Sequence, residues 1–117
     1  MKVVEIIADL EVEDLAAAQE FYAGYLGLSK QEFNLGWVAR QTSPTTGATL
    51  QLLTRDATAP VNPVVSVKVD DVDEAYAEAQ RRGYEIVHPL RDEDWGVRRF
   101  YVRAPDGNVL NVVQHRE

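Results

Sequence analysis

The stretch over residues 3–12 carries two carboxylates at a spacing that could support chemistry. Apolar residues alternate along it, which predicts a β-strand whose successive side chains point to opposite faces. Glu5 and Asp9 then fall on the same face. They would act as an acid–base pair, act as a counter-charge for a cation, or simply lie solvated near an open strand end. We keep both as candidate ligand-binding residues and assign a catalytic role to neither.

Two neutral amides occupy matching places in two similar segments. Residues 47–53 (GATLQLL) align with residues 107–113 (GNVLNVV), so that Gln51 matches Asn111 at an offset of 60 residues (111 − 51). In the second segment a Pro-Asp-Gly-Asn turn precedes the apolar run, and Gly107 supplies a position for positive φ. Both segments therefore predict the second strand of a β-hairpin, and their similarity indicates two copies of one module.

The helices repeat as well. Asp14 and Asp71 each stand at a helix N-cap position, and each predicted helix ends at a glycine. The apolar stripe of the first helix is expected to pack against a sheet. It consists of Leu15, Ala18, Tyr22, Tyr25 and Leu26.

Strands complete each copy. They are expected at residues 3–12, 29–34, 37–42 and 48–54, and again at 64–69, 85–88, 97–103 and 109–114, with a charged loop at 89–94. The predicted fold class is α+β, with tandem βαβββ modules over residues 1–56 and 63–117 and a linker at 57–62.

A module with one helix covers only one face of its sheet, so the predicted mixed sheet must curl around a concave pocket. If Val4, Ile6, Val65 and Val67 pack on the helices, alternation points the next residues into the hollow. Trp37, Trp95 and Tyr101 are added as aromatic candidates, although large aromatics are equally common in cores. The remaining candidate ligand-binding residues on this face are Glu5, Ile7, Asp9, Gln51, Val64, Ser66, Asn111 and Val113.

The amino-acid composition excludes several kinds of chemistry and partner. The 117 residues include no cysteine, which excludes disulfides and thiolate chemistry, and a net charge of -7 without a basic run argues against nucleic acid or an anionic membrane as partner. No apolar run suits a membrane helix and no signal peptide is evident, so we expect a cytoplasmic protein. His88 and His115 lack partners at ligand spacing, so His88 is interpreted as structural and His115 as a surface residue near the end of the chain. Arg98 and Arg99 would pair either with a carboxylate on a ligand or with the acidic residues 92–94, and we expect the second.

Residues 12–28, 69–76 and 95–108 together resemble the glyoxalase/bleomycin-resistance/dioxygenase superfamily, also called vicinal oxygen chelate proteins. The resemblance implies a homodimer whose sheets form the pocket. In its enzymes, His and Glu residues on four strands hold a divalent metal. The matching positions here are Ile7, Gln51, Val64 and Asn111, whose aliphatic and neutral amide groups predict no metal and no cofactor.

The resemblance, combined with these replacements, favours the metal-free, bleomycin-resistance-like branch. It implies a protein that sequesters an aromatic or cationic antibiotic-like molecule at the dimer interface, with the Trp95-Gly96 pair near the ligand. The alternative is a glyoxalase- or dioxygenase-like enzyme (lyase, isomerase or oxidoreductase), or a metal-free enzyme that uses Glu5 or Asp9 as base. Enzymatic activity therefore stays open, with the balance against it.

Overall fold

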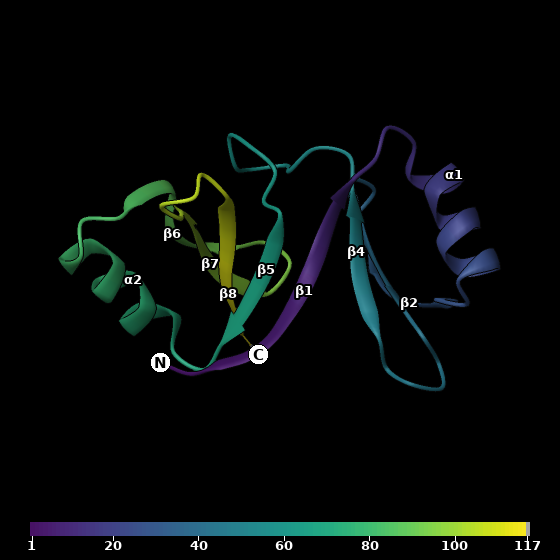
Figure 1. Cartoon of the computed structure of the whole chain (residues 1–117), viewed down its shortest axis with the longest axis horizontal. Helices are drawn as coiled ribbons and strands as arrows, with labels where there is room; N and C mark the ends of the chain where they lie inside the picture. Colours follow the sequence, from purple (N-terminus) through teal and green to yellow (C-terminus); the bar gives the residue numbers. More distant parts are fainter. Residues whose placement is uncertain (117) are drawn as a thin grey trace. The chain divides into compact units, whose positions relative to one another are not determined.

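The computed structural model describes residues 1–116, and Glu117, the last residue of the second predicted module, lies outside them. A β-α-β-β-β order occurs twice, which confirms the predicted α+β class. The first copy consists of β1 (Val3–Glu11), α1 (Leu15–Gln19), the π-helix η1 (Glu20–Tyr25), β2 (Lys30–Asn34), β3 (Val38–Thr42) and β4 (Thr49–Leu53). The second consists of β5 (Val65–Val69), α2 (Val72–Arg81), β6 (Glu85–Glu93), β7 (Val97–Arg103) and β8 (Val109–His115) (Figure 1).

The chain forms two compact units, Ile7–Asn62 and Met1–Ile6 together with the chain from Pro63 onward. Strand β1 contributes to both. Its end pairs with β4 in parallel, with Asp9 opposite Gln51. Its beginning is tied to the end of β5, where Lys2 and Asp70 exchange hydrogen bonds of 2.6 and 3.1 Å.

Both units have the same strand order. In the unit Ile7–Asn62 it is β2-β3-β4-β1, and in the other unit it is β6-β7-β8-β5. In each, the last strand of the copy runs parallel to the first and antiparallel to the third. The sequence repeat is thus a repeat of topology, and Gly47 and Gly107 both have positive φ, 79° and 94°, before the closing strand.

Helix α2 covers one face of its sheet. The Asp71 side chain caps it by accepting a hydrogen bond from the Glu74 N–H at 3.0 Å, as predicted. The buried residues Val72, Ala75 and Ala79 pack in one cluster with Val69, Phe100 and Val112 from the strands. Because side chains alternate along a strand, the residues next to Phe100 and Val112 lie on the face without the helix.

The first helix differs from its prediction. Asp14 caps it as expected, accepting from the Ala17 N–H at 3.1 Å, but after Gln19 the chain continues as a π-helix, with Leu26 N–H bonded to the Phe21 carbonyl at 3.3 Å. The wider turn moves the end of the apolar stripe off the packing face. Tyr25 and Leu26 are 77% and 48% exposed, so the expectation that they pack is wrong.

Strand β6 is longer than predicted. It continues from residue 88 through the expected charged loop to Glu93. Pro89 is tolerated because the register shifts between His88 and Arg91, where a ladder N–H is not required. This extension brings Glu93 onto the sheet.

The amino-terminal half of β1 is also different. Val4 and Ile6 were expected to pack on a helix, yet each is 63% exposed. The reason is that α2 contacts β6, β7 and β8. An apolar strip on β1 is therefore left open to solvent.

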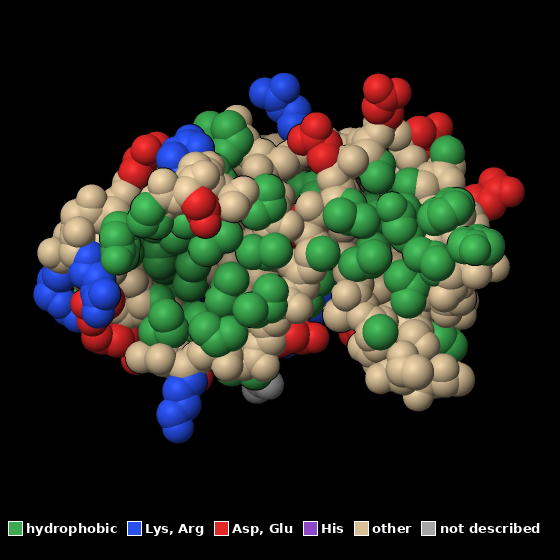
Figure 2. Space-filling view, in the orientation of Figure 1, with side chains coloured by type: hydrophobic (Ala, Val, Ile, Leu, Met, Phe, Trp, Pro, Cys, Tyr) green, Lys and Arg blue, Asp and Glu red, His purple; other side chains and the backbone are tan. Residues whose placement is uncertain are grey.

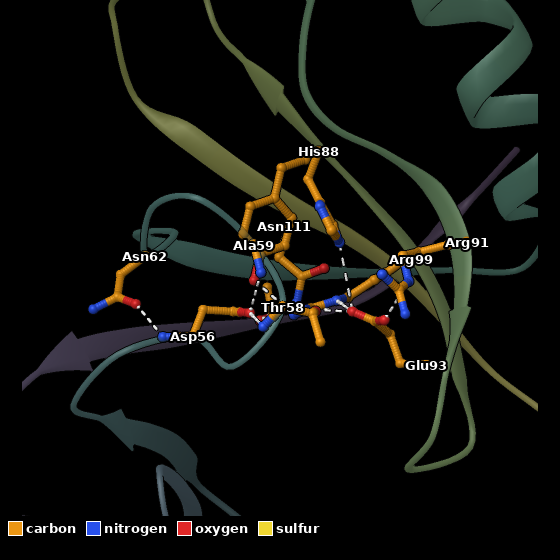
Figure 3. A network of polar contacts seen from close by, with 11 residues as sticks. Asp56, Thr58, Ala59, Asn62, His88, Arg91, Glu93, Arg99 and Asn111 are labelled. Atoms are coloured by element: carbon orange, nitrogen blue, oxygen red, sulfur yellow. Dashed lines mark hydrogen bonds and ion pairs between the residues drawn. The ribbon is translucent and has the colours of Figure 1, made fainter.

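The predicted linker forms no helix or strand, but it is locally ordered. The buried Asp56 carboxylate accepts from the N–H groups of Thr58 and Ala59 at 3.0 and 2.8 Å, and the Asp56 N–H donates to Asn62 at 2.7 Å (Figure 3). Such Asx turns fix a loop without regular structure. No helix among residues 1–116 is long and apolar enough to cross a membrane.

Candidate ligand-binding site

Four neighbouring strands of the second unit each place one polar or aromatic residue in a single row. Ser66 on β5 lies opposite Asn111 on β8, Asn111 opposite Tyr101 on β7, and Tyr101 opposite His88 on β6. All four are buried, with exposed fractions of 4%, 8%, 0% and 5%. The row lies on the face without the helix, since Phe100 and Val112 occupy the helix-covered face.

Asn111 is held from one side only. Its Nδ2 donates to the Ser66 hydroxyl at 3.0 Å, whereas its buried Oδ1 accepts no hydrogen bond from the described residues. A buried acceptor left in this state costs roughly 1–3 kcal/mol. The amide oxygen is therefore a buried acceptor that no described residue satisfies.

A charged cluster lies beside this row. Arg99 donates to Glu93 Oε2 through Nε at 2.7 Å and through Nη2 at 2.7 Å, and Arg91 Nε lies 2.7 Å from the other oxygen. The His88 Nε2 is 3.5 Å from Glu93. Figure 3 shows His88, Arg91 and Arg99 directed toward Glu93. Two guanidinium groups therefore lie on the same buried carboxylate.

Arg99 also lies between two aromatic rings. Its guanidinium carbon is 5.0 Å from the Trp95 ring centroid and 4.8 Å from that of Tyr101, within cation–π range. Its Nη1 donates to the Tyr101 hydroxyl at 2.6 Å, and the His88 ring meets the Tyr101 ring edge-on at 5.4 Å. Trp95 itself is half-buried.

The unit Ile7–Asn62 carries an equivalent row with different chemistry. Asp9, Gln51, Arg40 and Phe33 lie opposite one another on β1, β4, β3 and β2. Gln51 Nε2 donates to Asp9 at 2.6 Å, and its Oε1 accepts from Arg40 Nη2 at 2.9 Å and Nε at 3.2 Å. Both ends of this amide are thus engaged.

The other predicted site residues have separate surroundings. Glu5 is half-exposed and lies 3.8 Å from Lys68, so it has a different partner from Asp9. Val113 is buried at 7% exposure and Val64 is 44% exposed. Trp37 is half-buried, and its carbonyl accepts from the Thr54 N–H at 2.9 Å.

Sequence reasoning missed Arg40, His88 and Glu93 as parts of these rows. The pairing of Arg99 with the acidic residues 92–94 is confirmed, because its partner is Glu93. Strand parity with Gln51 could have found Arg40. His88 and Glu93 could not be found that way, since register shifts in β6 break the alternation.

A shallow hollow at the start of α2 is lined by Asp73, Asp92, Arg98 and Arg116. The charges pair internally, with Arg98 3.0 Å from Asp73 and 3.4 Å from Asp92, and Arg116 3.1 Å from Asp73. The hydrogen bond from Arg98 lowers the pKa of Asp73. This hollow offers no unbalanced charge to a ligand.

The model of the Glyoxalase/Bleomycin resistance protein/Dioxygenase superfamily matches residues 5–112. The chain belongs to this superfamily. Among proteins with curated descriptions, none matches the sequence.

Three solved structures superpose along nearly the whole chain. A protein described as an NAD-dependent benzaldehyde dehydrogenase from Legionella pneumophila superposes with a TM-score of 0.76 at 21% identity, covering 96% of this chain and 100% of its own. Methylmalonyl-CoA epimerase from Mycobacterium tuberculosis gives 0.73 at 21%, covering 98% and 90%. An uncharacterized protein from Methanosarcina mazei gives 0.69 at 29%, covering 98% and 94%. The first two likenesses show the fold alone.

The residues at the superfamily's metal positions do not fit a divalent metal. Ile7 and Val64 offer no donor atom, and the Gln51 oxygen already accepts from a guanidinium, whose charge repels a cation. Only the neutral Asn111 oxygen remains, while such ions prefer several carboxylate, imidazole or other anionic ligands. Among residues 1–116, no three His, Asp or Glu side chains gather in a way that could hold a metal ion.

Proposed function

We propose that this protein binds a small organic molecule and works without the metal of its superfamily. The observation that carries the proposal is the engagement of Gln51 by Arg40 at a metal position, since it replaces a metal by a fixed protein cation. The ligand lies on the helix-free face near Trp95, Tyr101 and Asn111. The function is sequestration of an antibiotic-like compound with an aromatic part.

The structure supports the aromatic part of this ligand better than a cationic part. Trp95 is half-buried and offers ring surface, and aromatic stacking contributes about 0.5–1.5 kcal/mol beyond area burial. Of the two predicted counter-charges, Asp9 is buried on Gln51, and Glu5 is the more accessible, with its side chain 40% exposed. A cationic group on the ligand would have Glu5 as its partner.

A second copy of the chain completes the proposed pocket. The exposed apolar residues Val3, Val4 and Ile6 on β1 need cover, and obligate dimer interfaces are more apolar than ordinary surface. Figure 2 shows hydrophobic side chains gathered on the visible face of both units. A homodimer would bury such side chains.

The test is a binding panel. Bleomycin and a set of planar antibiotics are titrated against the fluorescence of the two tryptophans, and the gene is expressed in a sensitive host. We expect at least one compound to change the emission saturably and the host to gain protection against it. Binding without protection would point to another role for the ligand, and no binding across the panel would remove the sequestration proposal.

A metal-free enzyme is the second candidate, and one arrangement favours it. The Tyr101 hydroxyl is 2.6 Å from a guanidinium nitrogen, and His88 lies beside a buried carboxylate, which together are groups used for proton transfer. If a bound compound is converted to a product detectable by mass spectrometry, and Tyr101→Phe abolishes the conversion while keeping affinity, the enzyme is the better assignment.

A further inference from the structure

The carbonyl oxygen of Asn111 is a buried acceptor without a partner among residues 1–116. Asn111 is 8% exposed, its Nδ2 donates to Ser66 at 3.0 Å, and its Oδ1 accepts nothing from the described residues. More than nine in ten buried polar groups in proteins are hydrogen-bonded. An open acceptor at this depth therefore requires an explanation.

The fold itself does not impose this state. Gln51 stands at the same register of the other unit and is equally buried, at 7% exposure. There the residue on the third strand is Arg40, which donates to the Gln51 oxygen at 2.9 Å. In the second unit, Tyr101 lies opposite Asn111. The Tyr101 hydroxyl lies at the far end of its side chain and accepts a hydrogen bond from Arg99, so it does not donate to Asn111 as Arg40 does to Gln51.

We propose that the Asn111 oxygen is the recognition point for a neutral hydrogen-bond donor on an aromatic ligand, an amide N–H or a hydroxyl. This inference rests on the proposed small-molecule binding and names the ligand's polar group. The aromatic part follows from Trp95, the half-buried ring next to the Arg99 guanidinium.

The charge beside the row selects a neutral donor over a cationic one. On the neighbouring strands, the guanidinium groups of Arg99 and Arg91 both lie on the carboxylate of Glu93, so guanidinium groups outnumber carboxylates among these three residues. An ammonium or amidinium ligand that approached Asn111 would be repelled by them. A neutral amide or hydroxyl pays no such penalty.

Three small probes test the proposal. Benzamide carries amide N–H donors, N,N-dimethylbenzamide keeps the ring and carbonyl but has none, and benzamidine carries the donors on a cation. Each is titrated by NMR while the side-chain NH₂ signals of Asn111 and Gln51 are followed. We expect benzamide to shift the Asn111 signals and to bind roughly tenfold more tightly than either analogue, because the analogues leave the acceptor open or add repulsion.

The titrations distinguish failure of the Asn111 recognition point from failure of the proposed small-molecule binding. Equal binding of benzamide and its dimethyl analogue would overturn the donor site while leaving aromatic ligand binding in place. Tighter binding of the dimethyl compound would show that the site favours methyl groups over N–H donors, and would overturn the proposal too. If no aromatic compound binds, including those of the antibiotic panel, both proposals fall.

A matched pair of variants gives a second readout. Asn111→Leu removes an open acceptor, whereas Gln51→Leu at the equivalent position takes a partner from both Asp9 and Arg40. We expect Asn111→Leu to lose the preference for benzamide with a smaller fall in Tm than Gln51→Leu causes. If Asn111→Leu keeps the preference, or lowers Tm more than Gln51→Leu, Asn111 has a structural role and the proposal is wrong.

Discussion

The Glu93 carboxylate is a buried charge whose stability depends on its ion-pair partners. It is 5% exposed and compensates the equally buried Arg99 through contacts of 2.7 Å. Removing one partner of such a pair leaves an uncompensated buried charge and costs about 3–5 kcal/mol. The cluster therefore stabilises the second unit only while it is complete.

Glu93→Gln is accordingly expected to lower the free energy of unfolding by about 3 kcal/mol, measured by urea denaturation. Arg91→Ala is the control, because Arg91 contacts the same carboxylate but has a 50% exposed side chain, and exposed pairs contribute about 0–1 kcal/mol. Equal losses in the two variants would contradict this account of Glu93.

Trp95 is the aromatic residue best placed to report a ligand. It is half-buried, with the Arg99 guanidinium 5.0 Å from its ring. Trp95→Ala should weaken binding of the best panel compound by about fivefold or more, since a lost stacking contact is worth on the order of 1 kcal/mol. Trp37→Ala serves as the matched control in the other unit, and a larger effect there would relocate the ligand.

Helix α2 carries the acid-sensitive interactions of its unit. Hydrogen bonds from Arg98 lower the pKa of Asp73, and hydrogen bonds from Arg82 and Arg81 lower the pKa of Glu78. A carboxyl whose folded pKa lies below its unfolded value stabilises the fold at higher pH and loses that contribution as pH falls through the folded pKa. Both residues therefore contribute at neutral pH, and their contribution declines once the pH falls below about 4.

We expect the Tm to fall as the pH is lowered through this acidic window, and Asp73→Asn to flatten the profile while lowering Tm slightly at pH 7. The effect is small because the Asp73 side chain is 55% exposed and screened by solvent. Asp106→Asn is the control, since this exposed carboxylate caps a turn and pairs with no arginine among residues 1–116. An unchanged slope in Asp73→Asn would rule out this source of acid sensitivity.

The residues at the superfamily's metal positions lack a suitable set of donor atoms, which predicts the metal content of the purified protein. Elemental analysis is expected to find no stoichiometric Mg, Mn, Fe, Ni or Zn, and added metal should not raise Tm, because binding to the native state would stabilise it. A stoichiometric metal that disappears in Asn111→Ala would show that the donor argument is wrong and would favour an enzyme.

Assembly depends on the uncovered strip of β1. Sedimentation at micromolar concentration should show a dimer, and Ile6→Asp should convert it to a monomer, because a charge in an apolar interface is strongly unfavourable. Glu13→Lys on the exposed turn after β1 is the control. A stable wild-type monomer would contradict the dimer.

Local signals in the sequence determined most of the fold. The glycines at 47 and 107 and the aspartate caps at 14 and 71 act through their own backbone, so the repeat, the helix starts and the βαβββ order could be predicted without tertiary structure. The superfamily positions Gln51 and Asn111 were found for the same reason. They stand at fixed distances from these signals.

Only the tertiary structure decided which neighbours each residue contacts. The bulges of β6 brought His88 and Glu93 to Arg99, and the π-helix turned Tyr25 outward, because register and helix period depend on packing across the sheet. The clearest case is the repeated amide. The sequence places Gln51 and Asn111 alike, but only strand pairing puts Arg40 beside one and Tyr101 beside the other, so that one oxygen is satisfied and the other stays open.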